Sequence, residues 1–584
     1  MLLEVAEKRL CLSIMVSKIS RIQILSVGVC TFALLIIVRL FFLQVVHGEA
    51  YSQSANKQYV RPAGGVFDRG SIYFTEKNGD LRSAATVRSG FILAINPTLV
   101  TDNQKYFELL NKIVELDKAE FLKKSAKKGD PYEEVAHRMT QEEADKVLAL
   151  DLPGVTTVRE RWRFYPGDSL ASHTLGFVGW GDDGIQAGRY GLERYYQDSL
   201  SRGEEKLYVN FFAEAFGNLS KTVFDNDSGE SDIITTIEPS VQNALEVAMQ
   251  KVKDSWDSSF TGGIVMDPNS GAIYAMTHLP GYDLNNFSSV KDPEIYRDPI
   301  VENVYEFGSV VKPLTMAAAI DSGAVTPSTT YEDKGFLQIG PDRISNFDKK
   351  GRGVVTMQEV LSKSLNTGTT FAMQKMGHNT FKKYMLSYGL DEKTGIDLPD
   401  ETSGIVTNLD SKRDIEYATA SFGQGIAITP VEMIRALASV VNGGYLVTPH
   451  LARAHVYKDP VERTKEIVYE KGAQVLKPET SETLQKMLTT VVDTSLLNGS
   501  MKLEHYRVGA KTGTAQIPDP TGGYYSDRYM HSFFGFFPSY DPKFIIFLYN
   551  YYPKGVDYAS HTLTEPFFNV AKFLISYYDI PPDR

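Results

Sequence analysis

A run of apolar positions dominates the start of the chain. The segment IQILSVGVCTFALLIIV, from Ile22 to Val38, carries no charge, and LFFLQVV continues it after Arg39. This length suits a helix that crosses a bilayer, and one arginine near its end can reach the interface with its head group. Bulky residues follow the run where a signal-peptide cleavage site would need small ones, so we expect a retained transmembrane helix over residues 22–46. Basic residues precede it (Lys8, Arg9, Lys18 and Arg21), which predicts a cytoplasmic N-terminus over residues 1–21 and an extracytoplasmic body.

Two pairs of apolar strands stand far apart in the second half of the chain. TGGIVMDPNSGAIYAMTH turns at Asp267–Gly271, and HSFFGFFPSYDPKFIIFLYNYY turns at Pro538–Pro542, so each reads as a hairpin. The positions between the hairpins repeat mainly with a helical period. Strands from both ends and helices in the middle predict one large α/β (α+β) domain over residues 231–580. We expect its sheet to be mainly antiparallel and flanked by helices.

The residues between the membrane segment and this domain have a mixed pattern. Helical stretches over Asn103–Asp117 and Thr140–Leu150 alternate with turn-rich segments. The polar stretch FDNDSGESD, Phe224 to Asp232, marks a boundary. The pattern therefore predicts a separate domain of mixed helices and strands over residues 47–230.

Composition and charge narrow the chemistry. A chain of 584 residues is too long for one core, which agrees with two or three domains. The net charge of −11 and the absence of a long basic cluster argue against a nucleic-acid partner. The two cysteines, Cys11 and Cys30, precede the main body, and no H-E-x-x-H occurs, so neither a zinc nor a redox site is expected.

The stretch YEFGSVVKPLTMAAAIDSG, Tyr305 to Gly323, places a serine and a lysine three residues apart at the start of a predicted helix. Gly308 permits a tight turn and a close backbone approach, and we expect Ser309 to be the N-cap residue. Positions three apart share a helix face, so Lys312 can point at the Ser309 hydroxyl. The same S-x-x-K spacing recurs at Ser54/Lys57, Ser125/Lys128 and Ser288/Lys291, so the spacing alone is weak evidence.

Two further motifs complete a site for acyl transfer to a peptide with a free carboxylate. Ser364-Leu-Asn366 follows the helix that the capping box Thr356-Met-Gln-Glu359 opens, and offers a polar pair to relay a proton. Lys511-Thr512-Gly513-Thr514 offers a cation on a strand, and its flanking glycines are expected to let a substrate chain come close. A second K-T-G, Lys393-Thr394-Gly395, lies in an acidic loop and is interpreted as a decoy.

The ordered set S-x-x-K, S-x-N and K-T-G resembles the signature of class B penicillin-binding proteins, which are monofunctional peptidoglycan D,D-transpeptidases. The resemblance extends over nearly the whole chain. Arg69-Gly70-Ser71-Ile72 resembles the motif that opens the family's non-catalytic (dimerisation-type) pedestal domain, and Gly191-Leu-Glu193 resembles the segment that closes it. Phe307 is a departure, because the family usually has proline there, and we expect it to alter the turn slightly.

The resemblance implies a role for each motif residue. Ser309 would attack the carbonyl of a terminal D-Ala-D-Ala, and Lys312 would be the base, made neutral by burial and by the charge of Lys511. Ser364 would pass the proton to the departing D-alanine, and Asn366 would hold Lys312 and a substrate amide. Lys511, Thr512, Gly513 and Thr514 would bind the substrate carboxylate. The backbone N–H groups of Ser309 and Thr514 would form the oxyanion hole.

The resemblance also implies partners, and it leaves alternatives open. No metal or organic cofactor is implied. The partners would be peptidoglycan stem peptides, β-lactams, the membrane, a multi-spanning glycan polymerase, and other proteins of the division or elongation machinery. The short C-terminal region after Gly513 and the G-A-K-T-G-T-A-Q context favour the division type over the elongation type.

Other activities are compatible with the same three motifs. A D,D-carboxypeptidase or a β-lactamase would use the same residues with water in place of the acceptor amine. The anchor and the large N-terminal module favour the synthase over these hydrolases. A β-lactam sensor or non-catalytic scaffold usually has several membrane spans or a cytoplasmic signalling domain, whereas a single span is expected here.

Overall fold

The computed structural model describes residues 30–36, 39, 67–181, 184, 186–202, 229–458 and 462–584. The expected cytoplasmic N-terminus, most of the expected membrane segment, the Ser54/Lys57 pair and the start of the Phe224–Asp232 boundary lie outside these residues. Within the described part, residues 30–36 are helical. In that same part, no helix is both long enough and apolar enough to span a bilayer.

The chain divides into two compact units, and the smaller one contains residues 89–160. Its core is formed by apolar side chains such as Leu93, Tyr106, Phe121 and Val147. The second half of β2 (Leu81–Ile95) pairs antiparallel with β3 (Glu133–Met139). Its helices are α4 (Asn103–Leu110), α5 (Lys118–Ser125) and α6 (Gln141–Leu148).

The larger unit contains residues 68–88 and 161–584 and is organised around a five-stranded antiparallel sheet in the order β16-β17-β18-β8-β9. Both predicted hairpins are confirmed as parts of this sheet. The strands are β8 (Phe260–Met266), β9 (Ile273–Leu279), β16 (Gly509–Pro518), β17 (Tyr524–Phe537) and β18 (Phe544–Tyr551). Strands from the two ends of the domain therefore meet in one sheet, as the pattern predicts.

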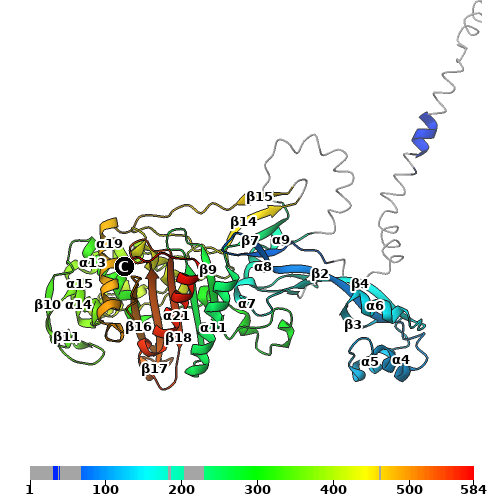
Figure 1. Ribbon diagram of the computed structural model, residues 1–584, viewed down its shortest axis with the longest axis horizontal. Coiled ribbons are helices and arrows are strands. Elements are labelled where there is room, and N and C mark those ends of the chain that lie inside the picture. The colour runs from blue at the N-terminus through cyan, green and yellow to red at the C-terminus, as the bar shows by residue number, and fades with distance from the viewer. Residues whose placement is uncertain are drawn as a thin grey trace, which may run out of the picture. The chain divides into compact units, whose positions relative to one another are not determined.

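Alternation along the central strand β18 gives the sheet two apolar faces. Ile546 and Leu548 join a core with α11 (Pro239–Ser255) and α21 (Thr564–Tyr577), which lie together over one face (Figure 1). Ile545 and Phe547 point the other way, into the larger core that contains the helices of the middle of the chain. A strand buried on both faces reads as a continuous apolar run, as FIIFLYNY does.

The helices between the two hairpins border the S-x-x-K and S-x-N motifs. They are α12 (Pro299–Glu302), α13 (Lys312–Asp321), α14 (Met357–Ser362), α15 (Asn366–Met376), α16 (His378–Ser387), α17 (Asp414–Ala420), α18 (Pro430–Val441) and α19 (Pro478–Thr494). Short 3-10 turns accompany them: η2 (Phe287–Ser289), η3 (Pro293–Tyr296), η4 (Gly308–Val311), η5 (Thr407–Asp410) and η6 (Leu496–Gly499). Two small hairpins stand before α14, formed by β10 (Thr330–Asp333) with β13 (Gly353–Thr356) and by β11 (Phe336–Ile339) with β12 (Asp342–Ser345).

A second sheet in the larger unit joins segments from far apart in the sequence. Its order is β15-β14-β7-β1 followed by the first half of β2, and β1 runs parallel to β7 through the pair Ile72↔Ile233. The strands not yet bounded are β1 (Ile72–Thr75), β7 (Ser231–Thr235), β14 (Ala452–Tyr457) and β15 (Arg463–Glu466). The remaining elements of this unit are β4 (Val155–Phe164, which starts in the smaller unit), β5 (Val178–Trp180), β6 (Gln186–Gly188), α7 (Ser172–Leu175), α8 (Gly191–Tyr195), α9 (Gln197–Leu200) and α20 (Ala559–Thr562).

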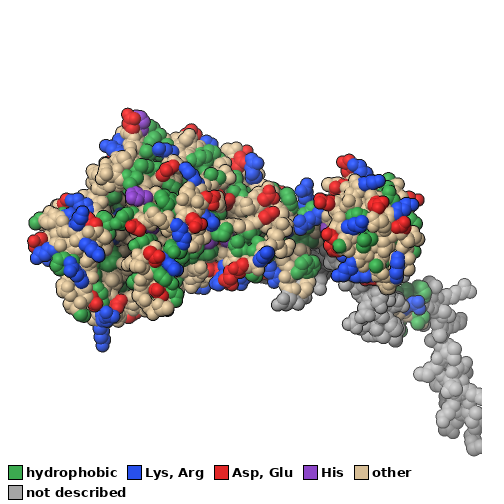
Figure 2. All heavy atoms as spheres, turned by 90° about the horizontal axis from the view of Figure 1, so that it is seen from below, with side chains coloured by type: hydrophobic (Ala, Val, Ile, Leu, Met, Phe, Trp, Pro, Cys, Tyr) green, Lys and Arg blue, Asp and Glu red, His purple; other side chains and the backbone are tan. Residues whose placement is uncertain are grey.

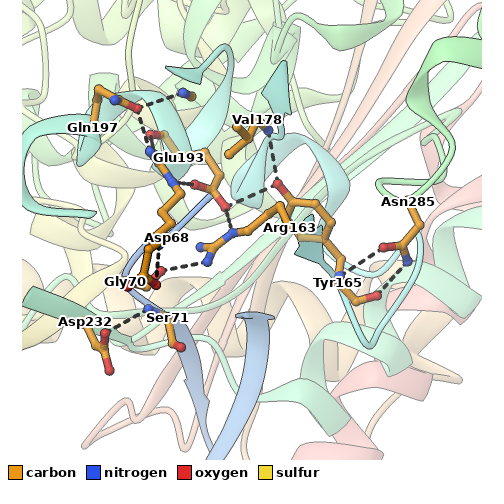
Figure 3. A network of polar contacts seen from close by, with 12 residues as sticks. Asp68, Gly70, Ser71, Arg163, Tyr165, Val178, Glu193, Gln197, Asp232 and Asn285 are labelled. Carbon is orange, nitrogen blue, oxygen red and sulfur yellow. Dashed lines mark hydrogen bonds and ion pairs between the residues drawn. The ribbon is translucent and has the colours of Figure 1, made fainter. Parts of the chain in front are cut away.

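A buried ion-pair network fixes the start of β1 in this unit. The carboxylate of Glu193, which is fully buried, accepts from Arg69 Nε at 2.6 Å, from Arg163 Nε at 2.5 Å and from the Tyr165 hydroxyl at 3.2 Å (Figure 3). Arg163 also donates to the carbonyl of Gly70 at 2.7 Å. The two motifs that the sequence resemblance singled out, around Arg69 and around Glu193, are thus in direct contact. Removing one partner would leave a buried charge unpaired, so we expect single substitutions here to destabilise the fold strongly.

On the face shown in Figure 2, acidic and basic side chains are interspersed, a distribution typical of ordinary protein surface.

Candidate active site

The predicted nucleophile, Ser309, lies in the 3-10 turn η4 directly before α13. Our expectation that it is the N-cap residue is wrong: the turn begins after Phe307, and the Ser309 side chain makes no capping hydrogen bond. The cause is Gly308, whose φ of 62° starts the 3-10 turn one residue before the serine. The Ser309 hydroxyl is therefore not engaged in capping and is partly exposed.

Gly308 is required by close packing as well as by its backbone angle. A Cβ at this position would stand 2.6 Å from the carbonyl oxygen of Thr514, so the turn and the K-T-G strand lie backbone to backbone. Phe307, the departure from the family pattern, is fully buried with its ring 5.0 Å from that of Phe547. Its carbonyl accepts from the Ser532 hydroxyl at 2.7 Å. Phe307 thus anchors the turn to the sheet.

Lys312, the first residue of α13, is completely buried and reaches the S-x-N motif. Its Nζ lies 2.7 Å from the carbonyl oxygen of Ser364, 3.2 Å from Ser364 Oγ and 2.8 Å from Asn366 Oδ1. The amide of Asn366 is oriented by a second bond, because its Nδ2 donates to the carbonyl of Ser345 at 3.0 Å. The acceptor oxygen of Asn366 is thereby held toward the lysine.

The environment of Lys312 favours its neutral form. Burial lowers the pKa of this amine far below its usual value, and the nearby charge of Lys511 lowers it further. A neutral amine has two N–H donors and one lone pair. The carbonyl of Ser364 and Oδ1 of Asn366 can only accept, so they take the two donors. The lone pair is then left for a hydroxyl proton, which is what a general base needs.

Ser364 holds a strained backbone conformation. Its φ is 54°, in the left-handed region where a side chain with a Cβ is unfavourable, directly after the C-cap residue Lys363 of α14. Glycine is the usual residue at such a position. The Ser364 hydroxyl stands between the two lysines, 3.2 Å from Lys312 Nζ and 2.9 Å from Lys511 Nζ. A proton can therefore pass along this hydroxyl without any change in the positions of the heavy atoms.

Lys511 lies on β16, which is an edge strand of the five-stranded sheet. Its amine is buried, and besides Ser364 Oγ it donates to the carbonyl of Thr512 at 2.8 Å. Burial lowers its pKa to about 7. At neutral pH the protonated and neutral forms of Lys511 are therefore present in similar amounts. A bound carboxylate would stabilise the protonated form.

The other residues of the K-T-G strand differ in one respect from expectation. The glycines beside Lys511 do not leave open space for a substrate. A Cβ at Gly513 would meet Ser532 Oγ at 2.3 Å and the Phe307 carbonyl at 2.4 Å, and one at Gly509 would meet the Phe536 ring at 2.2 Å. They allow close packing inside the protein. Thr512 and Thr514 are half-buried, and Thr514 Oγ1 accepts from the backbone N–H of Ala559 at 3.1 Å.

Two of the alternative motif copies form contacts away from this site. At the decoy, the backbone N–H and hydroxyl of Thr394 both donate to Glu401 at 2.6 Å, and Lys393 is exposed outside any strand. Lys128 of another S-x-x-K donates to the carbonyls of Pro97 and Val100. The structure therefore brings together Ser364, Asn366, Lys312 and Lys511 by hydrogen bonds, and it packs Gly308, the residue before Ser309, against the backbone of Thr514.

Sequence reasoning missed the residues that support this arrangement. Ser345, Asn346 and Asp333 lie on the small hairpins before α14 and contact the start of α15. Their polar side chains looked like ordinary turn residues in the sequence. The signal in the sequence is the pair Asp333 and Asn346, which flanks the short β11–β12 hairpin, but its meaning depends on a tertiary contact.

Two family models and several known proteins match this chain. The penicillin binding protein transpeptidase domain matches residues 261–571, and the penicillin-binding protein dimerisation domain matches residues 68–230. Stage V sporulation protein D of Bacillus subtilis (strain 168) is 32% identical over 93% of this chain and 83% of that protein. The peptidoglycan D,D-transpeptidase FtsI of Buchnera aphidicola subsp. Schizaphis graminum is 25% identical over 95% of this chain and 94% of that protein.

Solved structures show the same fold. Penicillin Binding Protein 2X from Streptococcus thermophilus superposes with a TM-score of 0.70 at 21% identity, covering 88% of this chain and 81% of that one. Penicillin binding protein 3 from Mycobacterium tuberculosis, complexed with ampicillin, gives a TM-score of 0.66 at 22% identity, covering 88% and 96%. The two family-model matches and the 32% identical relative show that the chain belongs to the class B penicillin-binding proteins, with a dimerisation domain followed by a transpeptidase domain.

Proposed function

We propose that this protein is a serine-type peptidoglycan D,D-transpeptidase that cross-links stem peptides at D-Ala-D-Ala and is acylated by β-lactams. The observation that carries the proposal is the hydrogen-bonded chain from Lys312 through Ser364 to Lys511, with distances of 3.2 and 2.9 Å. It joins a base with a depressed pKa to a relay hydroxyl and a cation, next to the turn that holds a serine.

The first half of the reaction forms an acyl-enzyme. The lone pair of Lys312 accepts the hydroxyl proton of Ser309 as its Oγ attacks the carbonyl carbon of the penultimate D-alanine. The negative charge on the carbonyl oxygen is stabilised by the backbone N–H groups of Ser309 and Thr514, where one donor is typically worth about 3–4 kcal/mol. The C–N bond then breaks, and the proton passes from Lys312 through Ser364 to the nitrogen of the departing D-alanine.

The second half reverses these roles. The amine of a second stem peptide attacks the ester carbonyl and gives up a proton toward Ser364 and Lys312. The bond between the carbonyl carbon and Ser309 Oγ breaks, and the serine recovers its proton. Throughout, Asn366 holds Lys312 in place, while Lys511 with the Thr512 and Thr514 hydroxyls binds the donor's terminal carboxylate before it leaves.

Product analysis separates this activity from hydrolysis. The test incubates the protein with a D-Ala-D-Ala stem peptide and an acceptor amine, and quantifies the cross-linked and hydrolysed products by mass spectrometry. A transpeptidase yields a cross-linked product that rises with acceptor concentration. Hydrolysis alone at every acceptor concentration would instead assign a carboxypeptidase, and rapid release of hydrolysed penicillin a β-lactamase.

For the cellular role, septal cell-wall synthesis is the leading assignment, supported by the division-type motif context and by the likeness to FtsI-named relatives. A second candidate is wall synthesis during sporulation, favoured by the 32% identity to a relative named for a stage of sporulation. A fluorescent fusion distinguishes the two. Mid-cell signal in growing cells supports division, signal confined to sporulating cells supports the second role, and lateral-wall signal supports elongation.

The domain layout that we propose follows the sequence. Residues 22–46 form a single membrane helix, residues 47–230 a pedestal that with the membrane helix contacts a multi-spanning glycan polymerase, and residues 231–580 the extracytoplasmic transpeptidase domain. The apolar run at Ile22–Val38 supports the anchor, and the match of residues 68–230 to the dimerisation domain supports the pedestal. Carbonate extraction of membranes tests the anchor: release of the intact protein into the soluble fraction would contradict it.

A further inference from the structure

One buried carboxylate near the site has no part in the reaction described above. Asp333, at the end of β10, is 2% exposed, and both of its oxygens are fully engaged. Oδ1 accepts from Gly335 N at 2.9 Å, Asn346 Nδ2 at 3.0 Å and Thr367 Oγ1 at 2.9 Å. Oδ2 accepts from Asn346 Nδ2 at 3.0 Å and Arg352 N at 3.1 Å. Every one of these contacts requires an acceptor, which a carboxylate provides at both oxygens.

The contacts of Asp333 orient Asn346, which replaces a missing helix cap. The helix α15 begins at Asn366, and its own N-cap residue, Leu365, has no side chain that can cap it. With its Nδ2 turned to Asp333, Asn346 presents Oδ1 to the backbone N–H and the hydroxyl of Thr367, at 3.3 and 3.0 Å. The negative charge of Asp333 also lies at the N-terminal end of α15, where the helix dipole favours it.

The same hairpin fixes the residue that holds the base. Ser345 directly precedes Asn346, and its carbonyl accepts from Asn366 Nδ2 at 3.0 Å. This bond decides which end of the Asn366 amide faces Lys312 Nζ, now Oδ1 at 2.8 Å. If the amide turned over, an N–H group would face Lys312 and occupy its lone pair, and the amine would no longer accept the serine proton.

We propose that Asp333 is a positioning residue for acylation: through Asn346 and Thr367 it holds the hairpin against the start of α15 and thereby keeps Asn366 oriented toward Lys312. This inference rests on the proposed function. It predicts that loss of the carboxylate slows the covalent step while leaving the carboxylate-binding cation, Lys511, and hence initial binding, intact.

The test replaces Asp333 with asparagine, which keeps the shape but puts an N–H₂ group against donors. Stopped-flow acylation with a chromogenic cephalosporin over a range of concentrations gives the dissociation constant of the initial complex and the acylation rate constant separately. We expect Asp333→Asn to lower the rate constant about 10- to 100-fold with a dissociation constant changed less than about threefold. The matched control is Glu332→Gln on the same strand: Glu332 is exposed and pairs only loosely with Lys334 at 3.6 Å, so both constants should stay at wild-type values.

Thermal unfolding shows whether Asp333→Asn folds, and a second pair of variants tests the inference if it does not. Thr367→Val removes the hydroxyl that contacts Asp333, Asn346 and the Tyr331 hydroxyl, and Thr367→Ser keeps it. We expect Thr367→Val to lower the acylation rate constant about 3- to 10-fold and Thr367→Ser to leave it nearly unchanged.

Several results would overturn the inference. They are a folded Asp333→Asn with a normal rate constant, a rise in the dissociation constant alone, or a normal Thr367→Val if Asp333→Asn does not fold. Failure of the proposed function would look different, because the wild-type protein would then not be acylated, would release hydrolysed penicillin rapidly, or would yield only hydrolysed stem peptide.

Discussion

The left-handed conformation of Ser364 allows its strain and its chemistry to be separated. Replacing it with alanine removes the hydroxyl but keeps the Cβ at a φ of 54°. Replacing it with glycine removes both. The left-handed conformation costs a residue with a Cβ about 1–2 kcal/mol, and glycine relieves this strain. The greater freedom of glycine in the unfolded chain offsets about 0.5–1 kcal/mol of the stability gained. Ser364→Gly should therefore be more stable than Ser364→Ala by about 0.5–1 kcal/mol.

Both variants lose the relay between the two lysines. They leave Lys511 Nζ without its acceptor at 2.9 Å. Among the described residues, they also remove the only side-chain hydroxyl within hydrogen-bond distance of Lys312 Nζ. Since a positioned proton relay is typically worth 10²–10⁴-fold, we expect acylation by penicillin to fall at least about 100-fold in both.

The assay combines thermal unfolding with acylation kinetics on the same protein samples. Because the entropy of unfolding is about 2.1 cal/mol/K per residue, a difference of 1 kcal/mol in a unit of this size corresponds to roughly 1 °C in Tm. The reasoning is refuted if Ser364→Gly is less stable than Ser364→Ala, because the strain would then not exist. It is refuted separately if either variant acylates at a wild-type rate, because the hydroxyl would then carry no proton.

Three further predictions concern the lysines and the turn. Lys312→Arg should abolish acylation, since arginine cannot give up its proton, whereas Lys511→Arg keeps a cation and should lower the acylation rate only about 10- to 100-fold (~1.4–2.8 kcal/mol). Lys393→Ala at the exposed decoy should be acylated normally. An inactive Lys393 variant together with normal Lys511 variants would refute our choice of strand. The rate of acylation at low β-lactam concentration should fall as pH rises through about 7, because the pKa of Lys511 is lowered to about 7 and its cation is lost above that value. Lys511→Arg should remove this fall in rate at alkaline pH. An unchanged fall in that variant would assign the titration to another group. Gly513→Ala should impair both folding and acylation, because its Cβ would stand 2.4 Å from the carbonyl of Phe307, directly before the 3-10 turn η4 that holds Ser309. A stable, active variant would show that this packing is easily relieved.

The sequence predicted those parts of the molecule that depend on local pattern. The strands around Asp267–Gly271 and Pro538–Pro542 alternate or run apolar over enough residues to be recognised, and the capping box at Thr356 and Glu359 is a local motif that the structure reproduces. The three candidate motifs can be recognised in the sequence because their residue types and order are specific, and the choice of Lys511 over Lys393 follows from the expected strand around Lys511.

Other features depend on tertiary contacts and escaped prediction. The start of the turn at Gly308, rather than a cap at Ser309, follows from packing against the carbonyl of Thr514, more than two hundred residues away in the chain. The glycines beside Lys511 were interpreted as space for substrate, whereas Phe536 and the Phe307 carbonyl occupy that space. The role that we infer for Asp333 likewise depends on its contact with Thr367, which no spacing in the sequence encodes.

The most direct test of the account is to locate the penicillin adduct. The wild-type protein and Ser309→Ala are treated with penicillin, digested and mapped by tandem mass spectrometry. We predict one penicilloyl group, on the Ser309 hydroxyl, and none on the Ser309→Ala protein. An adduct on Ser125, Ser288 or any other serine, or an adduct that persists in Ser309→Ala, would contradict the assignment of the nucleophile and of the site built around it.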